Sequence, residues 1–227
     1  RKQRKRFAHW IIPAGNLYLK ITGSPIVVLP HTLWLEWEHA VEASTRRSLV
    51  STDPFAGGTA LWCRRVSGTS LRQILAAGDC SSNQKSDAIR WSLASLQMLH
   101  ENVSDWGHGI RQSISHGDAT ANNVIVDVNK RTACWIDFDT RHQPHVSEAD
   151  RRTDDLRALI YSSAVHLPAS SFPELADILI AAQFDDAIVR HFRRRLTNEW
   201  INLTAAQLAQ APLRWSAARA LRSALLQ

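Results

Sequence analysis

The stretch Ser-His-Gly-Asp-Ala-Thr-Ala-Asn-Asn-Val-Ile-Val, residues 115–126, decides the fold that we predict for this chain. It carries a carboxylate at Asp118 and an amide at Asn123, which stands directly before an apolar run typical of a strand. A second apolar run, residues 132–138, follows after the polar residues 129–131. Two short apolar runs around a polar turn predict a β-hairpin.

The predicted hairpin brings two oxygen-bearing side chains to one end. Antiparallel pairing places the start of the first strand beside the end of the second, so Asn123 should lie close to Asp137. Mg²⁺ prefers oxygen ligands and is commonly held by few protein groups together with substrate phosphates. Asp118 lies on the preceding loop and is left to accept a proton from a hydroxyl group. These are the parts that phosphoryl transfer requires.

This segment resembles the catalytic loop and metal-binding strand of the protein-kinase-like superfamily. The His-Gly-Asp form is that of aminoglycoside phosphotransferases, choline kinases and lipopolysaccharide kinases. Four residues match the pattern H-[GR]-D-x-x-x-x-N, namely His116, Gly117, Asp118 and Asn123. Asp137 and Phe138 match the family's D-F-G motif, in which Asp139 replaces the glycine.

The resemblance implies an ATP-dependent kinase with ATP and Mg²⁺ as cofactors. It makes Asp118 the catalytic base and places His116 in the catalytic loop, where a histidine usually braces the loop through hydrogen bonds. A strand lysine should neutralise the nucleotide phosphates, and Lys20 fits. A helix glutamate should hold that lysine, for which Glu38 fits best and Glu42 second.

The resemblance implies further parts along the chain. Asn123 and Asp137 should hold the metal, and Asp155 fits the aspartate that braces the catalytic loop from a following helix. A hinge that takes the adenine edge fits residues 62–68. The glycine-rich phosphate loop should lie at or before residue 6, where no glycine occurs. We therefore expect that loop to be divergent or to precede the sequence given.

Hydrophobic patterning predicts the secondary structure of the rest of the chain. Residues 7–21 contain two apolar runs around Pro-Ala-Gly, which predicts a β-hairpin with Lys20 in its second strand. Residues 33–47, residues 86–102 and the chain beyond about residue 154 show helical spacing, and Ile89, Leu93 and Leu96 fall on one face of the second of these helices. Residues 59–63 are expected to form a further strand. Strands with one helix, followed mainly by helices, are an α+β pattern.

Pattern and resemblance together predict a protein-kinase-like, two-lobed fold. The small β-rich N-lobe should cover residues 1–66, and the larger, mostly helical C-lobe should cover residues 67–227. The length of 227 residues and a hydrophobic content of 44% are sufficient for such a packed core.

The composition of the chain indicates its cellular location and the kind of partner that it binds. The three cysteines form no C-x-x-C pair, which argues against a zinc site or a disulfide framework and favours a reducing, cytoplasmic location. No apolar run is long enough for a transmembrane helix or a secretory signal. The net charge of +6 suits an anionic partner. The basic residues are not interleaved with aromatic ones on a strand, so nucleic acid is not favoured.

The acceptor is expected to be a hydroxyl-bearing small molecule or saccharide, and an anionic saccharide suits the basic chain. The segment 140–150 is short and leaves little room for docking a peptide. Gly117 stands where regulated protein kinases carry an arginine, which argues against control by a phosphorylated loop. A pseudokinase-like scaffold and a protein serine/threonine kinase remain alternatives. His142 and His145 are predicted to lie on a solvent-facing loop rather than to form a metal pair.

Overall fold

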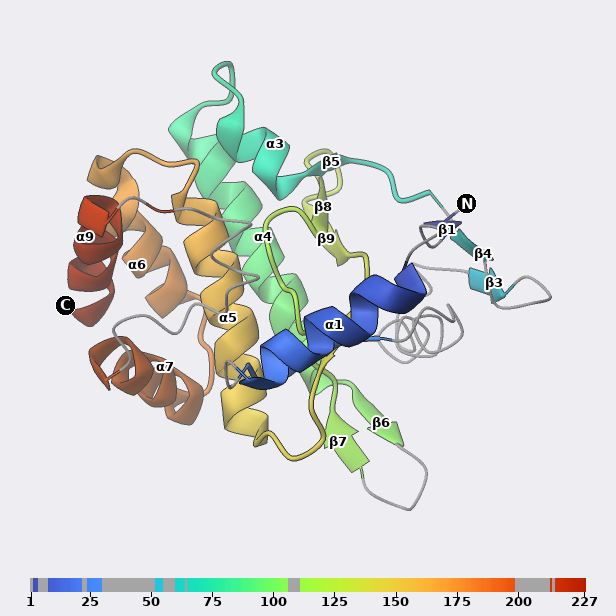
Figure 1. Cartoon of the computed structure of the whole chain (residues 1–227). Coiled ribbons are helices and arrows are strands. Elements are labelled where there is room, and N and C mark those ends of the chain that lie inside the picture. Colours follow the sequence, from blue (N-terminus) through green and yellow to red (C-terminus); the bar gives the residue numbers. More distant parts are fainter. Residues whose placement is uncertain are drawn as a thin grey trace.

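The computed structural model describes residues 2–3, 8–21, 24–29, 52–54, 60–63, 65–105, 111–198, 213 and 215–227. Within these residues, small antiparallel sheets are combined with helices, which confirms the α+β class (Figure 1). None of the described helices is long and apolar enough to cross a membrane.

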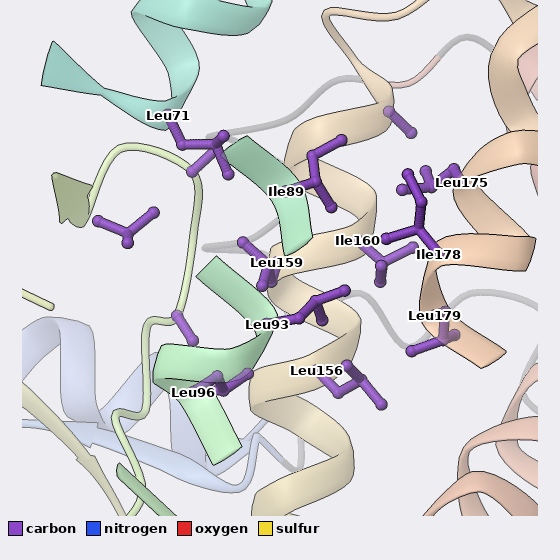
Figure 2. Close-up of a cluster of buried hydrophobic side chains, with 14 of the residues drawn as sticks. Leu71, Ile89, Leu93, Leu96, Leu156, Leu159, Ile160, Leu175, Ile178 and Leu179 are labelled. Atoms are coloured by element: carbon purple, nitrogen blue, oxygen red, sulfur yellow. The ribbon is translucent and has the colours of Figure 1, made fainter. Parts of the chain in front are cut away.

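Three helices form the centre of the core. They are α4 (Ser82–Glu101), α5 (Glu148–Ala164) and α6 (Phe172–Ala181). Figure 2 shows leucine and isoleucine side chains from all three helices meeting in one cluster. Leu93 and Leu159 are completely buried there. Burial of one such side chain stabilises the fold by about 1.5–3 kcal/mol.

The predicted long helix begins four residues earlier than expected, at Ser82 rather than Ser86. A capping box explains this start, because Ser81 Oγ accepts from the Gln84 backbone N–H and Gln84 Oε1 accepts from the Ser81 N–H. The expected apolar face is confirmed by the burial of Ile89 and the leucines that follow it at helical spacing. At the start of α5, Ser147 caps the Asp150 N–H in the same way.

The remaining helices surround this centre. They are α3 (Leu71–Ala76), the short 3-10 helix η1 (Ala169–Ser171), α7 (Asp186–Asn198) and α9 (Trp215–Leu226). Helix α7 contacts α5, and α9 contacts α6 (Figure 1). The prediction of a helical C-terminal third is therefore confirmed over the described residues.

The predicted hairpin is present. Strands β8 (Val124–Asp127) and β9 (Thr132–Trp135) pair antiparallel, with Val124 opposite Trp135. Strand β5 (Thr69–Ser70) joins the other edge of β8. This sheet rests on α4, where Ser95 Oγ donates to the Ala133 carbonyl at 2.9 Å.

Five further short strands form two small sheets. Strand β4 (Ala60–Cys63) pairs with β1 (Lys2–Gln3) and β3 (Thr52–Pro54), and β4 confirms a strand expected at 59–63. Strands β6 (Val103–Asp105) and β7 (Arg111–Ser113) form a separate pair just before the segment that carries Asp118.

An N-terminal strand pairs with a strand from the second half of the chain. Strand β2 (Ile26–Val28) lies antiparallel to β10 (Thr140–His142), with Val28 opposite Thr140. The pairing is extended by two backbone bonds, from Leu29 N to Asp139 O at 2.7 Å and from Gln143 N to Pro25 O at 2.8 Å. Strand β2 falls within the expected N-lobe and β10 within the expected C-lobe, so this ladder joins the two halves.

The predicted hairpin at residues 7–21 is wrong, because Ala8–Ile21 forms the single helix α1. The inward-facing residues Ile12, Asn16 and Leu19 recur at helical spacing, and this period overrides the Pro-Ala-Gly turn signal. Asn16 also fixes the helix to β2. Its Oδ1 accepts from Val28 N and its Nδ2 donates to Val28 O, both at 2.8 Å.

Candidate active site

The loop between β7 and β8 carries Asp118 and is closed by Asn123. The Asn123 amide nitrogen donates to the Asp118 backbone carbonyl at 2.9 Å and to the Asp118 carboxylate at 2.8 Å. Because a carboxylate can only accept here, the nitrogen must face Asp118 and the amide oxygen must point away. The Asp118 side chain is partly exposed, so a hydroxyl group of a bound molecule can approach it.

His116 braces the loop from beneath. Its ring is buried and packs against Phe138, with a centroid distance of 4.6 Å. Nε2 lies 2.9 Å from the Ile136 carbonyl, which can only accept, so Nε2 carries the proton. Nδ1 lies 3.3 Å from the Asp118 N–H and therefore accepts. These two bonds define a neutral ring that ties the loop to the strand end at residue 136.

Gly117 has a backbone that other residues adopt only with strain. Its φ is +82°, in the left-handed region, and a Cβ atom there would lie 2.8 Å from the Arg141 Cα atom. Strand β10 thus occupies the space that a side chain at position 117 would need. Local packing therefore requires a glycine at position 117.

Asp155 on α5 holds the loop that carries Asp118. Its carboxylate is buried and accepts from the backbone N–H groups of His116 at 2.7 Å and Gly117 at 2.9 Å. It also lies 3.0 Å from His100 Nε2. Burial alone would raise the pKa of Asp155, but the hydrogen bond from His100 and the electrostatic influence of His142 outweigh burial and hold that pKa well below its usual range. Burial lowers the pKa of His100, against the effect of its hydrogen bond with Asp155.

A second buried chain of hydrogen bonds supports the same loop. His142 Nδ1 lies 2.8 Å from Ser115 Oγ, and His142 Nε2 lies 3.2 Å from Asp154. Arg157 donates to the other Asp154 oxygen at 2.8 Å. Burial would raise the pKa of Asp154, but the bond from His142 and the charge of Arg157 keep it below its ordinary value.

The prediction that His142 lies on a solvent-facing loop is wrong, because this residue is buried in β10. His145 is exposed, as expected. Serine, histidine and aspartate also form the catalytic triad of hydrolases. Ser115 is buried here and His142 is only 2% exposed, so a substrate cannot reach them. These hydrogen bonds instead hold Ser115, the residue that precedes His116, in position.

Asp137 lies directly after the hairpin and has unusual geometry. Its φ is +65°, which is rare for a residue with a side chain and is found preferentially at functional sites. The Ile136 N–H donates to the Asn123 carbonyl at 2.9 Å, which fixes the strand ends next to each other. The Asp137 side chain is exposed. Asn123 and Asp137 are therefore brought to the same end of the hairpin.

Asn123 and Asp137 carry side-chain oxygen atoms that could bind a metal ion. Among the residues that the structure describes, no group of three or more His, Cys, Asp or Glu side chains could hold a metal ion. A site built from one amide and one carboxylate suits Mg²⁺, because this ion commonly takes its other ligands from water and phosphate. The exposed carboxylate of Asp137 and an amide oxygen of Asn123 that points away from Asp118 fit that requirement.

The structure describes one of the two predicted nucleotide-binding residues. Lys20 lies in the last turn of α1, exposed, and not in a strand, which corrects the expectation for its backbone. The period of the buried residues in α1 accounts for the difference. Glu38, with its alternative Glu42, lies outside the described residues, as does the helix expected at 33–47.

Sequence reasoning missed the residues that support the loop from a distance. Ser115, His142 and His100 each lack a motif of their own. The Asp154–Asp155 pair gave the available signal, because these consecutive aspartates stand directly before the apolar residues of the helix, and carboxylates on a buried face need partners. Comparison of the chain with protein-family models, curated proteins and solved structures finds no match.

Proposed function

We propose that this chain is an ATP-dependent kinase with a protein-kinase-like, two-lobed fold that transfers the γ-phosphate to a hydroxyl group. The observation that carries the proposal is the closed loop of Asp118 and Asn123 beside Asp137. The partly exposed carboxylate of Asp118, the buried amide of Asn123 and the exposed carboxylate of Asp137 lie within one hairpin and its preceding loop. Phosphoryl transfer depends mainly on positioning and charge neutralisation, which such a frame supplies.

Each residue has a distinct role in this proposal. Asp118 orients the acceptor hydroxyl group and takes up its proton. Asn123 and Asp137 would hold Mg²⁺, which when bound neutralises charge on the phosphates. Asp155 and His116 fix the loop so that Asp118 does not have to be ordered during the reaction.

The acceptor in this proposal is a small molecule or saccharide, and the location is cytoplasmic. The basic balance of the chain favours an anionic acceptor. Strand β10 packs against Gly117, which supports a site without the arginine that reads a phosphorylated activation loop. The proposal does not use Lys20, since this side chain is exposed on α1.

The test combines nucleotide binding with turnover. Mg²⁺ and ATP together should raise the melting temperature of the wild type, and purified protein should hydrolyse or transfer the γ-phosphate. Asp118→Asn should keep nucleotide binding and lose transfer, whereas Asp137→Ala should lose the Mg²⁺-dependent part of binding. Asp177→Asn, an exposed carboxylate on α6, is the matched control. A wild type whose melting temperature responds to neither nucleotide nor Mg²⁺ would refute the proposal.

A second candidate is a pseudokinase-like binding module. The observation that favours it is the position of Lys20, which makes no ion pair within the described residues and lies on the outer side of a helix. Such a module would bind nucleotide without turnover. Nucleotide-dependent stabilisation of the wild type, with no γ-phosphate release above that of Asp118→Asn, would identify it.

A further inference from the structure

Helix α1 presents an apolar stripe to solvent. Its exposed large hydrophobic side chains are Trp10 (72% exposed), Ile11 (62%), Leu17 (60%), Tyr18 (52%) and Ile21 (75%). At about 100° per residue these positions fall within an arc of about 120° on one side of the helix. They make up five of the nine exposed large hydrophobic side chains in the described part of the chain.

The opposite face of α1 is the one that packs on the protein. Leu19 is buried, and Asn16 is hydrogen-bonded to the backbone of β2. The exposed stripe is therefore not a core face turned outward by a wrong rotation of the helix. A helix that is anchored by one face and apolar on the other needs a second apolar medium to cover it.

The net charge of the chain is concentrated in the part of the sequence that contains α1. Residues 1–35 contain six Lys or Arg residues and no Asp or Glu, out of totals of 27 basic and 21 acidic residues. Removing these six from the 27 leaves 21 basic residues, which the 21 acidic residues balance. The whole formal charge of +6 thus comes from the first 20 residues, and Lys20 is exposed in the last turn of α1.

We propose that α1 lies on the surface of an anionic membrane. An apolar stripe that contains Trp and Tyr, beside a local excess of positive charge, matches helices that lie in the plane of a bilayer interface. The rings of Trp and Tyr are favoured at the depth of the lipid head groups. Basic residues next to such a helix are attracted by anionic lipids. An uncharged apolar partner would account for the stripe but not for the absence of acidic residues from residues 1–35.

The test is co-sedimentation of the full chain with lipid vesicles, without nucleotide, so its outcome is independent of the kinase proposal. One vesicle preparation is phosphatidylcholine alone, and the other contains about 30 mol % phosphatidylglycerol. The wild type should bind the anionic vesicles more tightly, and added salt should weaken this binding. Ile21→Ser should weaken it about tenfold or more, because one apolar side chain no longer enters the lipid.

Matched variants separate the stripe from general surface effects. Ile180→Ser removes an exposed isoleucine from α6 and should leave vesicle binding unchanged. Ile11→Ser should reproduce the loss at the other edge of the stripe, and Lys20→Gln should weaken anionic binding about fivefold. The proposal is overturned if the wild type ignores anionic vesicles or if Ile180→Ser loses as much binding as Ile21→Ser. The proposal is also overturned if the chain self-associates in sedimentation velocity and Ile21→Ser abolishes that self-association.

Discussion

Replacement of Asp155 by asparagine tests how strongly this residue stabilises the loop that carries Asp118. The change keeps the shape of the side chain and removes its charge and one acceptor oxygen. In the wild type, one carboxylate oxygen accepts from His116 N and His100 Nε2, and the other accepts from Gly117 N. An asparagine oxygen can serve the first pair, but its NH₂ group then faces the Gly117 N–H.

The free-energy loss follows from these bonds. The Gly117 N–H is left as a buried donor without an acceptor, which costs about 1–3 kcal/mol. The two remaining bonds lose their charge assistance, at about 1 kcal/mol each, while relief from burying a charge offsets part of this loss. We expect the variant to be less stable by about 2–3 kcal/mol, or about 5–10 °C in melting temperature for a chain of this size.

Urea denaturation and differential scanning fluorimetry measure the stability, and turnover assays measure the consequence for Asp118. Under the kinase proposal, kcat should fall because the loop is no longer fixed, while KM for ATP should stay unchanged. Asp177→Asn makes the same chemical change on the exposed side of α6 and should be neutral. If Asp155→Asn is as stable as this control, Asp155 is not the brace that its hydrogen bonds indicate.

Three further predictions concern other parts of the molecule. Gly117→Ala should destabilise the chain by about 1–3 kcal/mol in urea, because its backbone is left-handed and a Cβ atom would meet β10, whereas Gly78→Ala, with open space around it, should not. Stability should fall as the pH drops below about 6.5, by up to about 1.4 kcal/mol per pH unit, because burial lowers the pKa of His100 and the unfolded chain binds the proton first. His100→Gln should reduce this dependence of stability on pH in denaturation curves from pH 7 to 5, and an unchanged dependence would contradict the prediction. Asp155, whose pKa is also lowered, adds a loss of stability of the same sign only below about pH 4. Lys20→Ala should leave KM for ATP unchanged, and a large rise in KM would show that Lys20 reaches the nucleotide.

The parts of the fold that the sequence predicted are local. The hairpin of β8 and β9 joins neighbouring segments around a short turn, and alternation of buried residues specifies its register. Asn123 and Asp137 follow directly from that register. The apolar face of α4 likewise depends on spacing within one segment, and its start on the capping box at Ser81.

The parts that could not be predicted depend on contacts between distant segments. The hydrogen bonds from Ser115 to His142 and from His142 to Asp154 join the loop to a strand and a helix, and a lone histidine gives no sign of such partners. Helix α1 was mistaken for a hairpin because a local turn signal competed with a helical period. The anchor that decided between them is Asn16 on Val28, in a strand that itself depends on β10.

The pairing of β2 with β10 also has a consequence for the time course of folding. Val28 and Thr140 are direct partners but lie far apart in sequence, with α4 and the β8–β9 hairpin between them. Closing so long a loop carries a large entropic cost, and contacts of this kind form late. During synthesis, β2 cannot pair until β10 has left the ribosome, because this two-stranded sheet consists of β2 and β10. We therefore expect the apolar stripe of α1 to take up its final position only after the loop that carries Asp118 has been made.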